Sequence, residues 1–447
     1  MSYERNREQC CTSVACGSRS DTSVASSAVR RFYEQVSVLP TENSIADILS
    51  SQRKSPPPSI SQIVSAHAGS QLPEFELLRS CCRGEQNVSR AFSRNLGWDQ
   101  VFEQASYHRV LPALYRALQG RPEVPASIQS ALRARYLRHC QRVMRFSAEL
   151  AAILEHFKGE RIPVIAQKGP ALAHLLYGDS TMREFGDLDL LVSAPDVPRA
   201  VLALNQLGYV KYLQLSPRQE EAYLRSGYEY VFGRGTERNL VELQWNLLPK
   251  FYAIDINIEE LFARSREQEF DGCRARVLGP EDQLIFLCIH AAKHQWTRLG
   301  MVQDIAALAG FDLDWDWVIG NARRSGTLRI VLISLQCAQE VLGCGLPRAI
   351  TTAPEMSAAQ RFVSRINENI ETMHETSPES IAYFRFMIEV RERRIDQARF
   401  VWRLAMTPSV HEWRAIGIPD PLFPLYSLVR ARRLARRLFS FRVSLPS

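Results

Sequence analysis

The spacing of apolar and polar residues changes along this chain, and each change predicts a different kind of structure. Between residues 72 and 159, apolar residues recur three and four positions apart, as in WDQVFEQASYHRVLPALYRAL, which is the period of amphipathic helices. From residue 162 onward, short alternating or β-branched runs such as PVIAQK and DLDLLV stand between helical runs such as PALAHLLY and PDVPRAVLALNQLGY. We therefore expect an N-terminal helical region followed by a core that contains a sheet.

A hairpin and a second helical region follow. The runs YEYVFGRG and LVELQWNL alternate in polarity and are separated by the polar residues 236–239, which predicts two antiparallel strands. Farther along, helical spacing returns, with a Ser-, Pro- and Glu-rich segment at 351–380 that we expect to be a linker between helices. These patterns predict an α+β fold, in which a small mixed sheet within 161–279 is flanked by helices at 72–160 and 280–447.

The first part of the chain has a different composition. Residues 1–71 are rich in serine, include the stretch SSQRKSPPPSISQ and show little sustained periodicity. Such a segment buries too little apolar surface to offset the entropy of ordering it. We therefore predict that it is mostly disordered, with at most one short helix at 28–36.

Composition limits the class of protein. The chain has 447 residues, of which 46% are hydrophobic and 23% charged, and its formal net charge is +7. These values are ordinary for a globular protein, and the charge is too small to indicate a nucleic-acid or membrane partner by itself. There is no apolar run long enough for a transmembrane helix and no secretory signal pattern, so we expect a cytoplasmic protein. The ten cysteines lack paired CxxC motifs at zinc-site spacing, and we expect reduced thiols.

The stretch GDLDLLV places two aspartates in an otherwise apolar run. On a strand, residues two apart point to the same side, so Asp187 and Asp189 share one face. Two carboxylates held this close repel each other unless they share a proton or a cation lies between them. A hard divalent ion such as Mg²⁺ or Mn²⁺ suits these oxygen ligands, and a third acid, Glu242, stands on the later predicted strand. The alternative is that both aspartates are solvated or cap the turn after Gly186.

Five segments together resemble a known family. They are KGPALAHLLYGD at 168–179, MREFGDLDLLV at 182–192, VELQW at 241–245, LGPEDQLIFLCIHAAKHQW at 278–296 and VQDIAAL at 302–308. In order and spacing they resemble the uncharacterised nucleotidyltransferases of bacteria, a family of the nucleotidyltransferase superfamily with a DNA polymerase β-like catalytic fold. The similarity runs from residue 72 to near the C-terminus and leaves the Ser-rich segment outside.

The resemblance implies an enzyme that transfers a nucleoside monophosphate from a nucleoside triphosphate such as ATP to an acceptor and releases pyrophosphate. It implies that Asp187, Asp189 and Glu242 are the catalytic residues and the ligands of two divalent metal ions, Mg²⁺ or Mn²⁺. The turn at Lys168 and Gly169, ahead of a predicted helix, looks like the phosphate-binding loop of the superfamily.

Three further residues are weaker candidates for this site. Arg183 is a second candidate for the triphosphate, although an exposed arginine paired with Glu184 or Asp179 is an equally good interpretation. Lys293 could reach a phosphate or be solvated. Asp304 belongs to the resembling region, and a helix cap or a salt bridge is its alternative role.

Two histidines and a basic tail remain. His290 and His294 lie four apart on one helix face, but the HExxH zinc signature is missing because Ala291 follows the first histidine. The resemblance favours a role at the catalytic edge; plain helix-face histidines and metal ligation are the alternatives. Near the C-terminus, Arg430, Arg433 and Arg437 share one side of a predicted helix, which suits nucleic acid, anionic lipid or a solvated helix end.

The chain differs from the resembling family in two places. Gln244 stands where histidine is more frequent, and the sequence KGP replaces the usual Gly-Ser or Gly-Gly, so that Pro170 offers no N–H to a phosphate. These differences leave a second hypothesis open, in which the protein keeps the nucleotide site but acts as a catalytically impaired regulatory or interaction protein. We expect a small molecule or a protein as the acceptor and no nucleic acid, since no RNA-binding signature is present.

Overall fold

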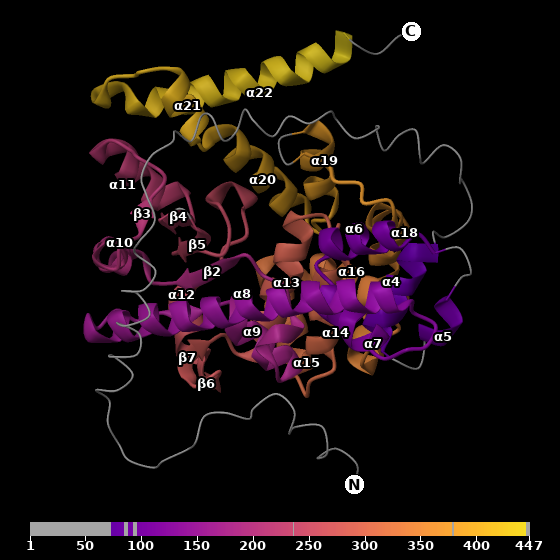
Figure 1. Ribbon diagram of the computed structural model, residues 1–447. Helices are drawn as coiled ribbons and strands as arrows, with labels where there is room; N and C mark the ends of the chain where they lie inside the picture. Colours follow the sequence, from indigo (N-terminus) through magenta and orange to yellow (C-terminus); the bar gives the residue numbers. More distant parts are fainter. Residues whose placement is uncertain (1–72, 85–87, 93–95, 236, 378–379, 444–447) are drawn as a thin grey trace. The chain divides into compact units, whose positions relative to one another are not determined.

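The computed structural model describes residues 73–84, 88–92, 96–235, 237–377 and 380–443 (Figure 1). The predicted disorder at 1–71 and the short helix predicted within it lie outside these residues.

A five-stranded mixed sheet lies at the middle of the sequence. Its strands are β1 (Ile165–Ala166), β2 (Asp187–Leu191), β3 (Val210–Lys211), β4 (Glu229–Arg234) and β5 (Glu237–Gln244), in the spatial order β1-β2-β5-β4-β3. Strands β2 and β5 are parallel, and the other neighbouring pairs are antiparallel. The mixed sheet among the helices confirms the predicted α+β fold. The hairpin turn is shorter than the predicted 236–239, because Glu237 already belongs to β5.

Short helices connect these strands, and a second hairpin follows them. The connecting helices are α9 (Gly169–Tyr177), α10 (Val197–Gln206), α11 (Pro217–Ser226) and α12 (Ile258–Arg264), with 3-10 turns η2 (Ser180–Met182), η3 (Ala194–Asp196) and η4 (Lys250–Tyr252). The separate hairpin of β6 (Arg266–Phe270) and β7 (Cys273–Val277) was not predicted. Its strands have five residues each, half of them charged, and only Phe270, Ala275 and Val277 are buried, so few apolar residues mark the hairpin in the sequence.

Helices precede the sheet, as the apolar spacing predicts. They are α4 (Pro73–Arg83), α5 (Val88–Ala91), α6 (Trp98–His108), α7 (Leu111–Leu118) and α8 (Ala126–Gly159). Figure 1 shows α8, which has 34 residues, extending from this group of helices to the sheet, where it packs against α10 and β7. Its buried residues Phe146, Leu150, Ile153 and Phe157 are spaced three and four apart and join the core of the sheet.

Helices also follow the sheet. They are α13 (Pro280–Lys293), α14 (Leu299–Ala309), α15 (Trp315–Ser325), α16 (Leu328–Leu342), α17 (Arg348–Thr351), α18 (Met356–Glu371), α19 (Ile381–Glu389), α20 (Arg394–Met406), α21 (Val410–Ala415), η5 (Asp420–Leu425) and α22 (Tyr426–Val443). The linker predicted at 351–380 is wrong, because α18 occupies much of it. Buried Phe362, Val363, Ile366 and Ile370 of α18 have helical spacing and pack against α16, which the polar composition of the segment obscures.

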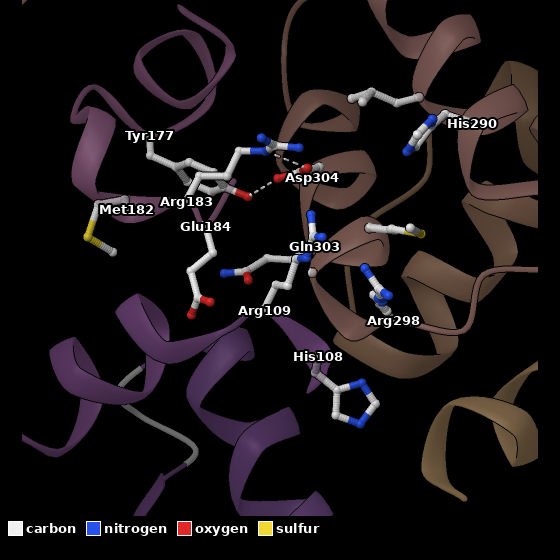
Figure 2. Close-up of a pocket in the computed structure, with 13 residues that line it drawn as sticks. His108, Arg109, Tyr177, Met182, Arg183, Glu184, His290, Arg298, Gln303 and Asp304 are labelled. Carbon is white, nitrogen blue, oxygen red and sulfur yellow. Dashed lines mark hydrogen bonds and ion pairs between the residues drawn. The ribbon is translucent and has the colours of Figure 1, made fainter. Parts of the chain in front are cut away.

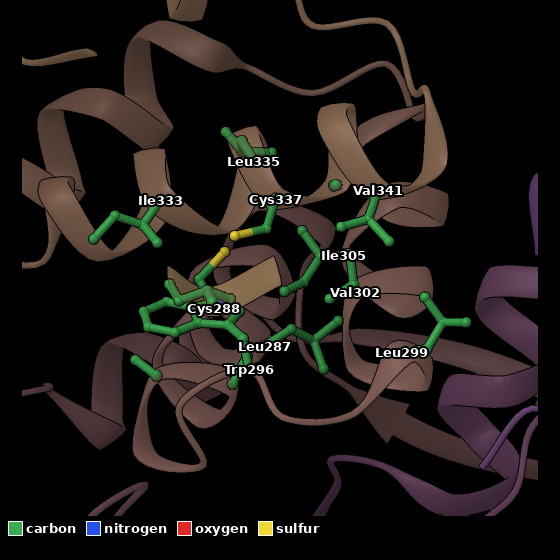
Figure 3. Packing of buried hydrophobic residues seen from close by; sticks show 14 of the residues in the cluster. Leu287, Cys288, Trp296, Leu299, Val302, Ile305, Ile333, Leu335, Cys337 and Val341 are labelled. Atoms are coloured by element: carbon green, nitrogen blue, oxygen red, sulfur yellow. The ribbon is translucent and has the colours of Figure 1, made fainter. Parts of the chain in front are cut away.

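The helices after the sheet share an apolar core. Figure 3 shows Leu287 and Cys288 of α13, Trp296, Val302 of α14 and Cys337 of α16 packed together. The cysteines in the described part of the chain are free thiols, as expected. Burial raises the pKa of Cys288 to about 12, so this thiol stays protonated. The core therefore holds α13, α14 and α16 in fixed positions relative to one another.

The basic C-terminal helix packs onto its neighbour. Arg433 Nε lies 2.8 Å from Glu412 Oε1 of α21, and Arg430 Nη1 lies 3.5 Å from Glu412 Oε2. These two arginines thus have a structural role that the sequence pattern did not indicate, while the side chain of Arg437 lies outside the described residues. Across the helices described, none combines the length and apolar character that crossing a membrane requires.

Candidate active site

The register between β2 and β5 brings the predicted acids together. The two strands are parallel, and Asp189 is paired with Glu242. Asp187 begins β2 and lies on the same face as Asp189, two residues on. Asp189 is buried, whereas Asp187 and Glu242 are partly exposed. The three predicted carboxylates therefore lie side by side on one face of the sheet, and solvent reaches Asp187 and Glu242.

Lys168, which we expected to contact phosphate, forms an ion pair with one of these acids. Its Nζ lies 2.8 Å from Asp189 Oδ1, and only 10% of its side chain is exposed. It precedes α9, whose first residue, Gly169, has a φ of 64°, and a Cβ there would lie 3.7 Å from Asp187 O. Burial lowers the pKa of Lys168, but Asp189 and Asp187 outweigh it, and the net pKa is raised. The ammonium group therefore stays charged beside Asp189.

A fourth acid, Glu229, completes this face, and the sequence analysis missed it. It begins β4 and is paired in register with Gln244 of β5. Gln244 Nε2 lies 3.1 Å from Asp189 Oδ1, 3.2 Å from Glu242 Oε2 and 3.4 Å from Glu229 Oε2. An amide nitrogen has two hydrogens, so the three carboxylates compete for it. The other oxygen of Asp189, Oδ2, is buried and has no hydrogen-bond partner among the residues described.

Burial is the main reason why the pKa values of Asp187, Glu229 and Glu242 are raised. Burial raises the pKa of Asp187, and Asp189 raises it further. Burial, followed by Asp189 and Glu229, raises the pKa of Glu242 to about 9. Burial also raises the pKa of Glu229. Among the described side chains, no three His, Cys, Asp or Glu groups are arranged as a metal site, and the lysine and glutamine bond to the carboxylates instead.

Helix α13 presents basic residues near the same face. Lys293 Nζ donates to Tyr228 OH at 3.0 Å, next to Glu229, and burial lowers the pKa of Lys293. The rings of His290 and His294 have centroids 4.8 Å apart. Burial and the nearby lysines lower the pKa of both histidines, that of His294 to about 3, so both are neutral. Within the described structure, neither ring bonds to a carboxylate, so a role of the pair at the catalytic edge stays a prediction.

Arg183 and Asp304 form a buried pair near the site. Arg183 Nε lies 2.8 Å from Asp304 Oδ2, and Tyr177 OH donates to Asp304 Oδ1 at 2.8 Å (Figure 2). Asp304 is thus a salt-bridge residue, the alternative that the sequence left open for it. Arg183 is paired as well, but not with either of the carboxylates considered for it. Glu184 instead accepts the backbone N–H of Leu111 at 2.9 Å.

Comparison with known proteins adds a family to this geometry. The sequence model of the family described as "Uncharacterised nucleotidyltransferase" matches residues 94–343 of the 447. No curated protein matches the chain in sequence. The crystal structure of ANT(2")-Ia in complex with adenylyl-2"-tobramycin is similar over 50% of this chain and 98% of that chain, at 14% identity and a TM-score of 0.26, too low to carry an argument. Because the family match covers more than half of the chain, including all four carboxylates, the chain belongs to the uncharacterised nucleotidyltransferase family.

Proposed function

We propose that the protein transfers a nucleoside monophosphate from a nucleoside triphosphate to an acceptor and releases pyrophosphate. The observation that carries this proposal is the register pairing of Asp189 with Glu242, which places both carboxylates and that of Asp187 on one face. Membership of the nucleotidyltransferase family supports the same class of reaction. The partners that this reaction requires are the triphosphate and an acceptor, either a small molecule or a protein.

The acidic face fits a divalent cation, Mg²⁺ or Mn²⁺. Asp189 Oδ2 is buried without a partner, and burial and the neighbouring carboxylates raise the pKa values of Asp187 and Glu242. Carboxylate oxygens are the ligands that such hard cations prefer. We assign Asp187, Asp189 and Glu242 as the ligands. When bound, the cation would lower the pKa of an attacking hydroxyl and stabilise charge on the phosphate.

Lys168 and the first turn of α9 are the proposed phosphate-binding element. Gly169 lets the backbone approach a ligand closely, and the N-terminus of a helix attracts anions. Pro170 offers no N–H, so the ammonium group of Lys168 carries more of the interaction. Lys168 would exchange Asp189 for a phosphate oxygen when the nucleotide binds. Arg183, held in place by Asp304, is the second proposed contact of the triphosphate.

Glu229 is the proposed general base of the transfer step. An oxygen or nitrogen of the acceptor forms a bond to the α-phosphorus, and the bond from that phosphorus to the bridging oxygen breaks, with its electron pair leaving on pyrophosphate. The acceptor's proton passes to Glu229, the one carboxylate of the face that is not assigned to the metal. Tyr228 hydrogen-bonds to Glu229 and accepts a hydrogen bond from Lys293, so this carboxylate is held in place.

The alternative is a nucleotide-binding regulatory or interaction protein without turnover. Gln244 favours it, because its amide bonds to the carboxylates that a metal would need, and the Pro170 turn weakens the phosphate element. This alternative predicts nucleotide binding without pyrophosphate release for any acceptor. Sustained, metal-dependent turnover would exclude it.

The first test is a calorimetric titration of each nucleoside triphosphate, with Mg²⁺, into the wild type, Asp189→Asn and a control. The control is Asp312→Asn, whose side chain is exposed in the loop before α15. We expect binding that requires Mg²⁺, and a loss of about tenfold or more in Asp189→Asn, because one charged ligand is removed. Asparagine keeps a hydrogen-bond acceptor for Lys168, so circular dichroism should show an unchanged fold. Absence of binding to the wild type would end the nucleotide proposal, and equal binding by Asp189→Asn would remove the ligand assignment.

A further inference from the structure

A small cavity lies beside the acidic face, on the side of Asp187. It is enclosed by the α6–α7 connection, the end of α9 and the start of α14 (Figure 2). Arg109 lines the cavity, and its positive charge and the carboxylate of Asp187 shift each other's pKa. The cavity is therefore close enough to the acidic face for their charges to interact. Its volume is about 50 Å³. Since one water molecule needs about 10–15 Å³ by such a measure, the cavity holds a group of a few atoms and not a triphosphate.

Two arginines line this cavity: Arg109, which is exposed, and Arg298, which is partly buried. In the described structure, neither Arg109 nor Arg298 forms an ion pair, and the guanidinium carbon of Arg298 lies 5.8 Å from the centre of the Tyr107 ring. Burial lowers the pKa of Arg109 and the positive charge of Arg298 lowers it further, whereas the carboxylates of Asp187 and Glu184 oppose this decrease without cancelling it. Arg109 also ends α6 with a φ of 57°, which is unfavourable for a residue with a Cβ. An anion between the two groups would relieve their repulsion.

The carboxylates on the cavity wall are already bonded elsewhere. Asp304 accepts hydrogen bonds from Tyr177 and Arg183, one on each oxygen. Glu184 accepts the backbone N–H of Leu111, at the start of α7. The charge of Glu184 acts on Arg109 without an ion pair between them in the described structure, so the hydrogen-bond donors of both arginines can still reach a ligand.

His108 and Gly300 also contribute to the wall of this cavity. His108 Nδ1 accepts the N–H of Leu299 at 3.2 Å, so its hydrogen is on Nε2, which is buried and has no partner among the described residues. Burial and then Arg298 lower the pKa of His108 to about 4, which keeps the ring neutral. Gly300, in the first turn of α14, also lines the cavity, and a Cβ there would lie 2.8 Å from His108 O. The N-terminus of α14, which carries a positive partial charge, therefore packs closely against the backbone of His108 and Arg109.

The cavity is separate from the first turn of α9, although Arg183, the second proposed contact of the triphosphate, also lines it. Tyr177, in its wall, is the last residue of α9, and Gly169 is the first. Eight residues of α-helix span about 12 Å. The first turn of α9, with Lys168, and the cavity thus lie toward opposite ends of this helix. They can bind two different anionic groups at once.

We propose that this cavity binds a single anionic group of the acceptor, a phosphate or a carboxylate, and so holds the acceptor beside the nucleotide on the acidic face. The proposal rests on the proposed function and narrows it to an acceptor that carries a negative charge. Arg109 and Arg298 are the binding residues, and the first turn of α14 adds the positive end of a helix. Arg183, whose Nε is bonded to Asp304, also lines the cavity, and we assign it to the triphosphate and not to the acceptor.

The test uses inorganic phosphate and acetate as probes, titrated calorimetrically into the full chain with and without saturating Mg²⁺ and a non-hydrolysable triphosphate, at constant ionic strength. The variants are Arg109→Ala, Arg298→Ala and Arg298→Lys, and the control is Arg394→Ala, which removes an exposed arginine at the start of α20. We expect at least one probe to bind the nucleotide-loaded wild type and control. Each alanine variant should lose about tenfold or more of that affinity, because a charge-assisted hydrogen bond is lost. Arg298→Lys keeps the positive charge but not the planar guanidinium group, so it should lose less affinity for the probe than Arg298→Ala. A graded loss of this kind indicates an effect on binding, whereas a variant that fails to fold would bind no probe.

Three results would overturn the proposal. They are no binding of either probe to the wild type, equal binding by the arginine variants, and displacement of the probe by the triphosphate, which would assign the cavity to the nucleotide. The nucleotide titration alone decides the proposed function, whereas the probe titrations decide this proposal, so the two can fail separately.

Discussion

Replacing Glu242 by glutamine should stabilise the protein at alkaline pH in the absence of metal and abolish its stabilisation by Mg²⁺. In the folded protein, burial and the carboxylates of Asp189 and Glu229 raise the pKa of Glu242 from 4.5 to about 9. Between these values the folded state holds a proton that the unfolded chain has released. Glutamine has the same shape and does not ionise, so it removes this difference between the two states.

The sign and size of the effect follow from proton linkage. Because the folded state binds the extra proton, the free energy of unfolding of the wild type falls as pH rises, by up to about 1.4 kcal/mol per pH unit. Between about pH 6 and about pH 8 the wild type should lose about 3 kcal/mol, and the slope should vanish below the lower pKa and above the higher one. The proton is shared within the carboxylate cluster, so the loss belongs to the cluster and Glu242→Gln removes most of it.

Urea unfolding at several pH values, in EDTA and in Mg²⁺, measures this prediction. The control is Glu103→Gln, which changes an exposed carboxylate on α6. In EDTA the wild type and the control should lose stability as pH rises, and Glu242→Gln should lose much less. Mg²⁺ should stabilise the wild type increasingly as pH rises, because the metal displaces the proton, and should leave Glu242→Gln unchanged. Parallel pH profiles for the wild type and Glu242→Gln, or a wild type that gains stability over this range, would refute the reasoning.

Two further substitutions test the roles of single residues. Glu229→Gln should lower kcat by about 10²–10⁴-fold while nucleotide affinity, measured by calorimetry, is retained, because a general base is lost; an equal loss of nucleotide binding would instead place Glu229 in the nucleotide site. Gly300→Ala should lower the free energy of unfolding by about 1–3 kcal/mol, because its Cβ would lie 2.8 Å from the backbone oxygen of His108. Gly320→Ala in α15, whose Cβ would meet only Arg324 Nη1 at 3.7 Å, should be neutral or slightly stabilising in the same urea titration, and equal effects of the two would contradict the close approach.

The acidic face could be predicted in part because its signal is local. Strand alternation alone puts Asp187 and Asp189 on one side, and the apolar run that contains them predicts the strand. The alternation in YEYVFGRG also fixes which side of its strand Glu229 occupies. What the sequence does not contain is the register, and only the pairing of Glu229 with Gln244 and of Asp189 with Glu242 makes these residues neighbours.

The contacts around that face could not be predicted, because they join distant segments. Arg183 and Asp304 are 121 positions apart, and Lys293 and Tyr228 are 65 positions apart. An arginine near an acidic face has several possible partners in sequence, and the pair that forms is decided by how α14 packs against α9. The helix within the predicted linker was missed for a related reason, because its apolar positions become informative only once α16 lies opposite them.

The turn between α13 and α14 is what relates the two proposed sites to each other. Gln295 and Trp296 both have a φ of 53°, a backbone conformation that persists in residues with a Cβ only when surrounding packing enforces it. Trp296 is fully buried in the helical core, and its Nε1 donates to Ser334 Oγ of α16 at 2.9 Å. This anchor fixes the angle between α13, which places Lys293 beside the acidic face, and α14, whose first turn closes the cavity. Transfer to an acceptor, as proposed above, requires the reacting atoms to be held in line, and the packed core that joins α13 and α14 would provide that alignment.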